Sequence, residues 1–111
     1  MVTLCTLFDA NYLDKGLVLY ESLERCVKEF RLYTLAMDQK CLQILRDLRL
    51  SNATIISLDD FCKEEDLEIL RKQRSAAEFC WTCTPHLIEY IFEQYGEVVC
   101  TYVDADICFY G

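Results

Sequence analysis

Two carboxylates near the end of the chain have the types and spacing to hold a divalent cation. Asp104 and Asp106 follow the mostly apolar run Val98–Val103 and are separated by one residue. In an extended chain, residues i and i+2 point to the same side, so the two side chains can converge on one point. Neighbouring carboxylates repel each other and are costly to desolvate unless a cation lies between them. The pair therefore indicates a site for Mg²⁺ or Mn²⁺, hard cations that prefer carboxylate oxygens and are often shared with substrate phosphates.

The residues around the Asp pair predict where it lies in a fold. The preceding run is rich in Val and Tyr and predicts a strand buried on both faces. Open α/β sheets place their ligands at the carboxyl ends of such strands. The motif itself is short, and the alternative is a strand end whose carboxylates cap the next turn in solvent. The two interpretations are about equally compatible with the local sequence.

The segments before this pair alternate between strand and helix patterns. Residues 2–8, 32–37 and 53–58 are each rich in β-branched, aromatic or aliphatic residues and are predicted to be strands. Helical spacing of apolar residues fills the intervals between them. This alternation predicts an α/β fold, Rossmann-like, with three α/β/α layers and a mostly parallel sheet. No linker or internal repeat is present, so residues 1–111 are expected to form a single domain.

Polar residues at the strand ends predict where the helices begin. Asp14 is the expected N-cap of a first helix, and Asp38 that of a second. Thr84 followed by Pro85 predicts the start of a later helix that stops at Gly96. The apolar stripe of the first helix is expected at Leu17, Tyr20, Leu23, Val27 and Phe30.

Composition and charge limit the possible partners and location. The net charge of −8 argues against nucleic acid or an anionic membrane as a partner. No apolar run is long enough for a transmembrane helix, and the first residues lack the basic region of a signal peptide. We therefore expect a cytoplasmic protein whose eight cysteines stay reduced and pack as small apolar residues. Cys80 and Cys83 have C-x-x-C spacing but no matching second pair, so a core role is predicted for them as well.

Two segments together resemble a known family. Asp9–Tyr12, after the first predicted strand, and Tyr102–Asp106, at the end of the last one, resemble the paired signatures of GT-A glycosyltransferases. The nearest resemblance is to nucleotide-sugar transferases similar to glycosyltransferase family 8, and Leu19–Leu23 also resembles those enzymes. The resemblance covers nearly the whole chain, but it corresponds to the donor-binding N-terminal half of such an enzyme. It implies a GT-A fold and one donor-binding domain without the acceptor half.

The resemblance also implies roles for individual residues. Asp9, Asn11 and Tyr12 would hold the nucleotide, with the Tyr12 ring stacked on the base. Asp106 would ligate Mn²⁺ or Mg²⁺, and Asp104 would reach the metal or the ribose. The expected activity is metal-dependent transfer of a glycosyl group from a nucleoside-diphosphate sugar, a UDP-sugar being the expected donor, to an unknown acceptor.

The basic residue of the family pattern has no clear counterpart here, and the resemblance leaves competing functions. Family 8 enzymes commonly place an arginine in the helix before the acidic motif, and here Arg74 is the nearest basic candidate, with a surface charge as its alternative role. A second function is a non-catalytic module that binds a nucleotide or metal. A nucleotidyltransferase of the same fold usually has a Gly-rich, basic loop after its first strand, which residues 9–14 lack. An Asp-nucleophile phosphatase would need further motifs after the Asp pair, and only five residues follow it.

Overall fold

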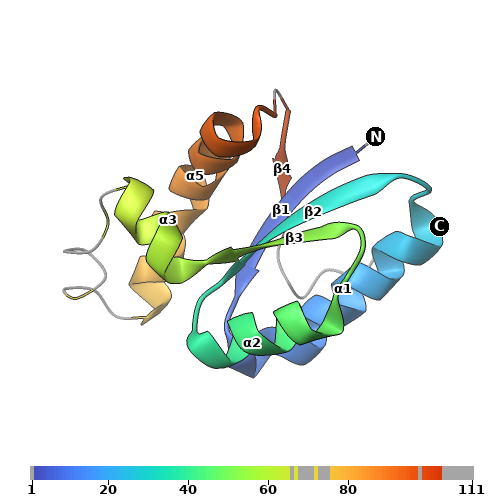
Figure 1. Cartoon of the computed structure of the whole chain (residues 1–111), viewed down its shortest axis with the longest axis horizontal. Helices are drawn as coiled ribbons and strands as arrows, with labels where there is room; N and C mark the ends of the chain where they lie inside the picture. Colours follow the sequence, from blue (N-terminus) through green and yellow to red (C-terminus); the bar gives the residue numbers. More distant parts are fainter. Residues whose placement is uncertain (1, 66, 68–71, 73–75, 98, 104–111) are drawn as a thin grey trace.

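Four parallel strands form the sheet at the centre of the molecule. In this computed structural model, which describes residues 2–65, 67, 72, 76–97 and 99–103, they pair in the order β3-β2-β1-β4 (Figure 1). The strands are β1 (Val2–Phe8), β2 (Phe30–Ala36), β3 (Ala53–Ser57) and β4 (Thr101–Tyr102). The predicted α/β class and its parallel sheet are confirmed.

The register of the sheet brings the carboxyl ends of the strands to one edge. β1 and β2 pair over their whole length, from Val2 opposite Phe30 to Phe8 opposite Ala36. β4 pairs with the other side of β1, where Cys5 lies opposite Tyr102. All these pairs are parallel, so the loops that leave the strands gather at the same edge.

Helices cover both faces of the sheet and give it the three layers that the sequence predicts. α1 (Leu13–Cys26) and α2 (Gln39–Leu48) pack on one face, and α3 (Leu58–Glu65) and α5 (Ala76–Tyr95) on the other (Figure 1). Alternate β1 residues take part in different clusters: Leu4 packs with α1 residues, and Leu7 with residues of α3 and α5. A sheet buried in this way reads as a continuous apolar run, as β1 and β2 do.

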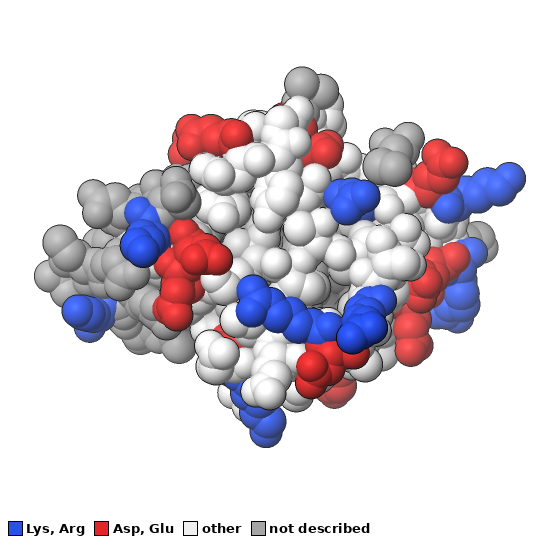
Figure 2. All heavy atoms as spheres, in the orientation of Figure 1, with Lys and Arg blue, Asp and Glu red and all other residues white. Residues whose placement is uncertain are grey.

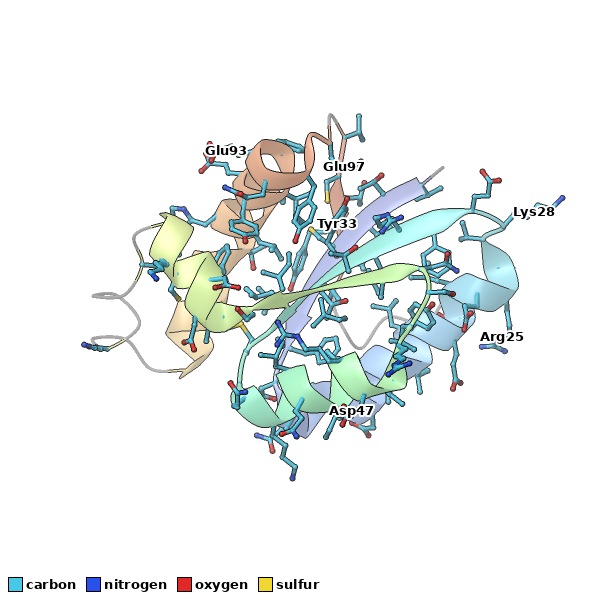
Figure 3. The ribbon with its side chains drawn as sticks, in the orientation of Figure 1. Arg25, Lys28, Tyr33, Asp47, Glu93 and Glu97 are labelled. Atoms are coloured by element: carbon cyan, nitrogen blue, oxygen red, sulfur yellow. The ribbon has the colours of Figure 1, made fainter. Side chains whose placement is uncertain are left out.

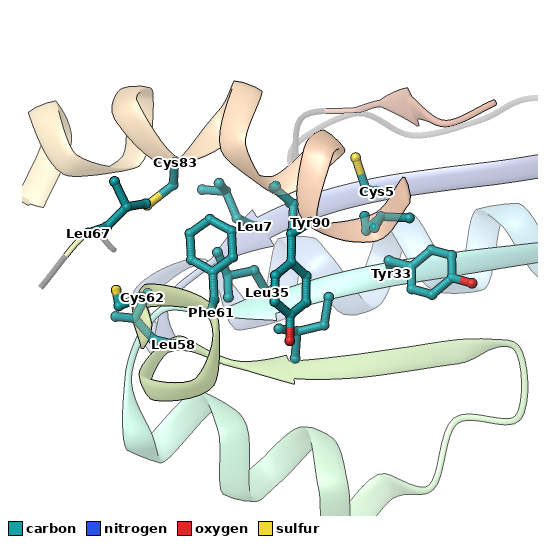
Figure 4. Close-up of a cluster of buried hydrophobic side chains, with 13 residues drawn as sticks. Cys5, Leu7, Tyr33, Leu35, Leu58, Phe61, Cys62, Leu67, Cys83 and Tyr90 are labelled. Atoms are coloured by element: carbon teal, nitrogen blue, oxygen red, sulfur yellow. The ribbon is translucent and has the colours of Figure 1, made fainter. Parts of the chain in front are cut away.

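The larger core cluster lies between the sheet and the α3–α5 pair. Figure 4 shows Phe61 of α3 and Tyr90 of α5 near each other, beside the strand residues Leu7 and Leu35. The Phe61 and Tyr90 rings meet edge to face, with their centroids 5.5 Å apart. Cys5, Cys62 and Cys83 are buried in this cluster, so the predicted core role is confirmed for them. The Cys80 side chain lies outside what the structure describes.

Glu97 joins the end of α5 to the amino-terminal end of the sheet. One of its oxygens accepts a hydrogen bond from Thr3 Oγ1, and the other accepts one from Tyr33 Oη, both at 3.0 Å (Figure 3). Burial, with the nearby Glu97 carboxylate, raises the pKa of Tyr33 to about 12. The bonds tie the connection between α5 and β4 to β1 and β2.

Three predicted helix boundaries are wrong. α1 begins at Leu13, so Asp14 lies in its first turn instead of capping it. α1 also ends at Cys26, and Phe30 begins β2. α5 begins at Ala76 and contains Pro85 in its interior, although Thr84-Pro85 resembles a helix start. Asp14 is not the cap because the chain enters α1 through a 3₁₀ turn that the Asp9 side chain caps. Phe30 does pack with α1 residues, but it does so from β2.

The last strand is less buried than its apolar sequence suggests. Val99 is 68% exposed and Thr101 is exposed, whereas Val103 is buried against α1 residues. β4 is an outer strand of the described sheet and pairs with β1 alone, so the prediction of burial on both faces is wrong for this segment. None of the helices in the described part of the chain has the length and hydrophobicity of a transmembrane span.

The contact between Gly16 and Phe8 generates a test of how α1 packs on β1. A Cβ atom at Gly16 would lie 2.4–2.8 Å from atoms of the buried Phe8 ring. Gly16→Ala should therefore lower the free energy of unfolding, because overpacking costs about 1–3 kcal/mol and improved helix propensity returns only about 1 kcal/mol. Urea denaturation measures the change. The half-exposed Val18→Ala in the same helix should change little, and a stabilised Gly16→Ala variant would contradict this packing.

Thr6 provides a second test within β1. Its side chain is fully buried, and its hydroxyl has no hydrogen-bond partner among the described residues. Thr6→Val should raise the free energy of unfolding by about 1 kcal/mol, because it removes a desolvated hydroxyl at nearly constant shape. Thr3→Val is the matched control. It should lower the free energy of unfolding, because it removes the hydrogen bond to Glu97. Equal effects of the two substitutions in urea denaturation would contradict this account.

Candidate functional site

The candidate site lies where the chain leaves β1 at the carboxyl edge of the sheet. β1 continues through α1 into β2 on one side, whereas its other neighbour is β4, from the end of the chain. Strand order thus changes direction at β1, and open α/β sheets bind ligands at such a point. The structure places Asp9, Asn11 and Tyr12 together there, in the turn that follows β1.

Asp9 shapes this turn through its own side chain and backbone. Its carboxylate accepts a hydrogen bond from the Asn11 N–H at 2.9 Å, and its carbonyl accepts one from the Tyr12 N–H at 3.1 Å. These bonds form the short 3₁₀ helix η1 (Ala10–Tyr12), which runs directly into α1. An Asp at such a position accepts from backbone two residues ahead, which explains why the sequence turns here. We call residues 9–12 the β1 turn.

Tyr12 presents an aromatic ring at the surface of the β1 turn. The residue is 52% exposed, and Lys15 Nζ lies 5.4 Å from its ring centroid. A cation at this distance is attracted to the ring face. An exposed aromatic ring beside a cation is able to stack on a planar heterocycle and to place a positive charge near an anionic group.

Asp38 connects the β1 turn to the beginning of α2. One carboxylate oxygen accepts a hydrogen bond from the Cys41 N–H at 2.8 Å, which confirms the predicted N-cap. The other oxygen accepts one from the Ala10 N–H at 3.1 Å. The cap was recognisable from the sequence, whereas the contact with Ala10 was not, because it joins residues 28 positions apart.

Two further donors, which flank Asp38 in the sequence, bind the end of β1. The Phe8 carbonyl accepts a hydrogen bond from the Met37 N–H at 3.0 Å and one from the Cys41 thiol at 3.6 Å. Burial raises the pKa of this thiol to about 12, and the nearby Asp38 and Asp9 carboxylates add to the shift. At neutral pH the Cys41 thiol is therefore protonated and serves as a hydrogen-bond donor to Phe8.

A small pocket opens next to the site between the carboxyl ends of β2 and β3. It is lined by Ala36, Asp38, Gln39, Leu42, Ser57, Leu58 and Asp59. Its lining combines apolar side chains with oxygen acceptors and shares Asp38 with the contact to the β1 turn. On the face shown in Figure 2, basic side chains lie among acidic ones.

The remaining predicted site residues fall outside the described part of the chain. Arg74, Asp104 and Asp106 lie there, so their predicted roles stay predictions. The described chain reaches Val103, whose N–H donates to the Cys5 carbonyl at 2.9 Å and which directly precedes Asp104 in the sequence. Within residues 2–65, 67, 72, 76–97 and 99–103, no group of three or more His, Cys, Asp or Glu is arranged to hold a metal ion.

Comparisons with known proteins find distant similarity over the whole domain. No family model matches the chain. It is 26% identical over 108 residues to the uncharacterized protein YfnF of Bacillus subtilis. The aligned region covers 96% of this chain and 35% of YfnF. The uncharacterized protein YfnD of the same organism is 25% identical over 109 residues, and this alignment covers 96% of this chain and 34% of YfnD. The chain thus spans about a third of the length of these relatives, and neither relative's name states a function.

The raised pKa of Cys41 predicts a loss of stability in alkaline solution. Above about pH 9 the unfolded thiol loses its proton while the folded one keeps it up to about pH 12, so the free energy of unfolding falls as pH rises. One such proton contributes about 1.4 kcal/mol per pH unit. Urea denaturation between pH 8 and 10.5 should show a shallower decline for Cys41→Ala. The buried neighbour Leu42→Ala should keep the wild-type slope, and equal slopes in all three proteins would contradict the prediction.

Proposed function

We propose that this chain is the donor-binding part of a metal-dependent glycosyltransferase that uses a nucleoside-diphosphate sugar. The observation that supports it is the β1 turn, which presents an exposed Tyr12 ring at the point where strand order reverses. β4 pairs with the middle of β1, at Leu4 and Cys5, and leads in sequence to the Asp104–Asp106 pair. The resemblance of both segments to GT-A signatures supports the same function.

The proposal assigns a contact with the nucleotide to each of three residues of the β1 turn. In this proposal Tyr12 stacks on the base, an interaction worth on the order of 1–3 kcal/mol per base in nucleic-acid systems. Asp9 and Asn11 supply acceptor and amide groups for the base or ribose. UDP is the proposed nucleotide and a UDP-sugar the proposed donor, with a hexose as the expected sugar.

The diphosphate requires positive charge in a chain whose net charge is −8. Asp104 and Asp106 would hold Mn²⁺ or Mg²⁺, since hard divalent cations prefer carboxylate oxygens. When bound, such a metal stabilises the negative charge that develops on a departing nucleoside diphosphate. Arg74 would add a fixed positive charge toward the same group. Nucleotide binding should therefore depend strongly on the metal.

A second candidate function is a module that binds the nucleotide and metal without turnover. Glycosyl transfer needs acceptor-binding groups in addition to a donor site, whereas a binding module needs the nucleotide and metal site alone. The two candidates share the same nucleotide site. They differ in whether UDP is released from a UDP-hexose in the presence of an acceptor mixture.

Calorimetric titration of UDP into the protein tests the shared site. With Mn²⁺ present we expect saturable binding, and with EDTA we expect it to disappear. The double variant Asp104→Ala/Asp106→Ala should abolish metal-dependent binding. The double variant Asp47→Ala/Glu93→Ala is the charge-matched control, because both residues are exposed, on α2 and α5 (Figure 3), and it should bind UDP as the wild type does.

The same titration with Tyr12→Ala tests the stacking. The loss of one base–aromatic contact should weaken UDP binding about fivefold or more. Absence of binding to folded wild-type protein would contradict the proposed function. Binding that is indifferent to EDTA and to the loss of both Asp104 and Asp106 would contradict the metal site.

A further inference from the structure

Asp38 is a hydrogen-bonded link between two turns that are distant in sequence. Its two carboxylate oxygens accept from different segments: Oδ1 from the Cys41 N–H at 2.8 Å and Oδ2 from the Ala10 N–H at 3.1 Å. The first bond is a helix cap of ordinary type. The second reaches the residue between Asp9 and Asn11, in the middle of the β1 turn.

The β1 turn has bonds within itself and to the next residue, Leu13, and it has the bond from Ala10 to Asp38, which is distant in sequence. The Asn11 and Tyr12 N–H groups both donate to Asp9, so these bonds determine the shape of the turn. They do not determine its orientation relative to the sheet. The Ala10–Asp38 bond, together with the packing of Ala10 on the cluster that contains Phe8 and Ala36, ties the turn to the end of β2. Asp38 follows β2 directly after Met37, and the Met37 N–H is itself bonded to the Phe8 carbonyl.

We propose that Asp38 is a positioning residue for nucleotide binding, holding the β1 turn in the orientation that presents Asp9, Asn11 and Tyr12. This inference rests on the proposed function. A turn released from Asp38 would have to be ordered when the nucleotide binds, and that cost would appear as weaker affinity. Asp38 makes no contact with the nucleotide in this account.

Two substitutions separate this role from that of an ordinary helix cap. Asp38→Ser keeps a good N-cap, since Ser caps helices as well as Asp does, but its single hydroxyl oxygen does not serve both N–H groups. Asp38→Asn keeps the side-chain length but has one acceptor oxygen, and its amide group donates where Ala10 needs an acceptor. Both variants should therefore keep α2 and lose the link to the β1 turn.

Asp47→Asn is the matched control. Asp47 is exposed near the end of the same helix (Figure 3), so this variant makes the same change of charge without the link. The full chain is used throughout, with UDP and Mn²⁺ as the probe. Three quantities are measured: the exchange rate of the Ala10 amide hydrogen by NMR, the thermal unfolding midpoint, and the dissociation constant for UDP.

We expect the Ala10 amide to exchange at least tenfold faster in both Asp38 variants. UDP should bind about five- to tenfold more weakly to them, while the unfolding midpoint of Asp38→Ser stays close to that of the wild type. Asp47→Asn should match the wild type in all three measurements. A general structural role would lower the unfolding midpoint. A positioning role changes the Ala10 exchange rate and the affinity for UDP together and leaves the midpoint unchanged.

The outcomes separate this inference from the proposed function. If the wild type binds UDP and both Asp38 variants have dissociation constants within twofold of the wild-type value, the positioning role is overturned and the proposed function stays intact. Absence of UDP binding to the wild type would overturn the proposed function and the positioning role with it. Unchanged Ala10 exchange in both variants would overturn the link itself, whatever the nucleotide does.

Discussion

The in-register parallel pairing of β1 with β2 is the constraint on which the rest of the structure depends. Seven successive residue pairs, from Val2–Phe30 to Phe8–Ala36, align the two strands end to end. Parallel strands need both faces covered and a crossover between them, which α1 supplies. The same alignment brings the β1 turn and Asp38 to one edge, within hydrogen-bonding distance of each other.

The opposite end of the sheet determines where the last strand begins. Glu97 is held by Thr3 and Tyr33, and Gly96 before it has a φ of +68°, a conformation that glycine adopts without strain. This turn brings the chain from the end of α5 to β4 beside β1. The position of β4, and with it the point from which the chain continues toward the Asp pair, therefore depends on contacts far from the candidate site.

The carboxylates of the described site are largely engaged with backbone N–H groups. Asp9 and Asp38 accept three such bonds between them. A carboxylate held in this way shapes a loop and presents its remaining oxygen lone pairs. In the proposed function these two residues organise the nucleotide site, and the cation is assigned to the separate pair at Asp104 and Asp106. Loop shape and metal binding are thus divided between different acidic residues.

The sequence by itself determined the strands, their parallel arrangement and the Asp38 cap, because apolar runs and cap residues act over a few neighbouring positions. It also located Asp9, Asn11 and Tyr12 after the first strand. Only the tertiary structure decided that α5 runs through Pro85, that β4 is an outer strand, and that Asp38 reaches Ala10. These features depend on packing and hydrogen bonds between residues far apart in the chain, for which local patterns contain no signal.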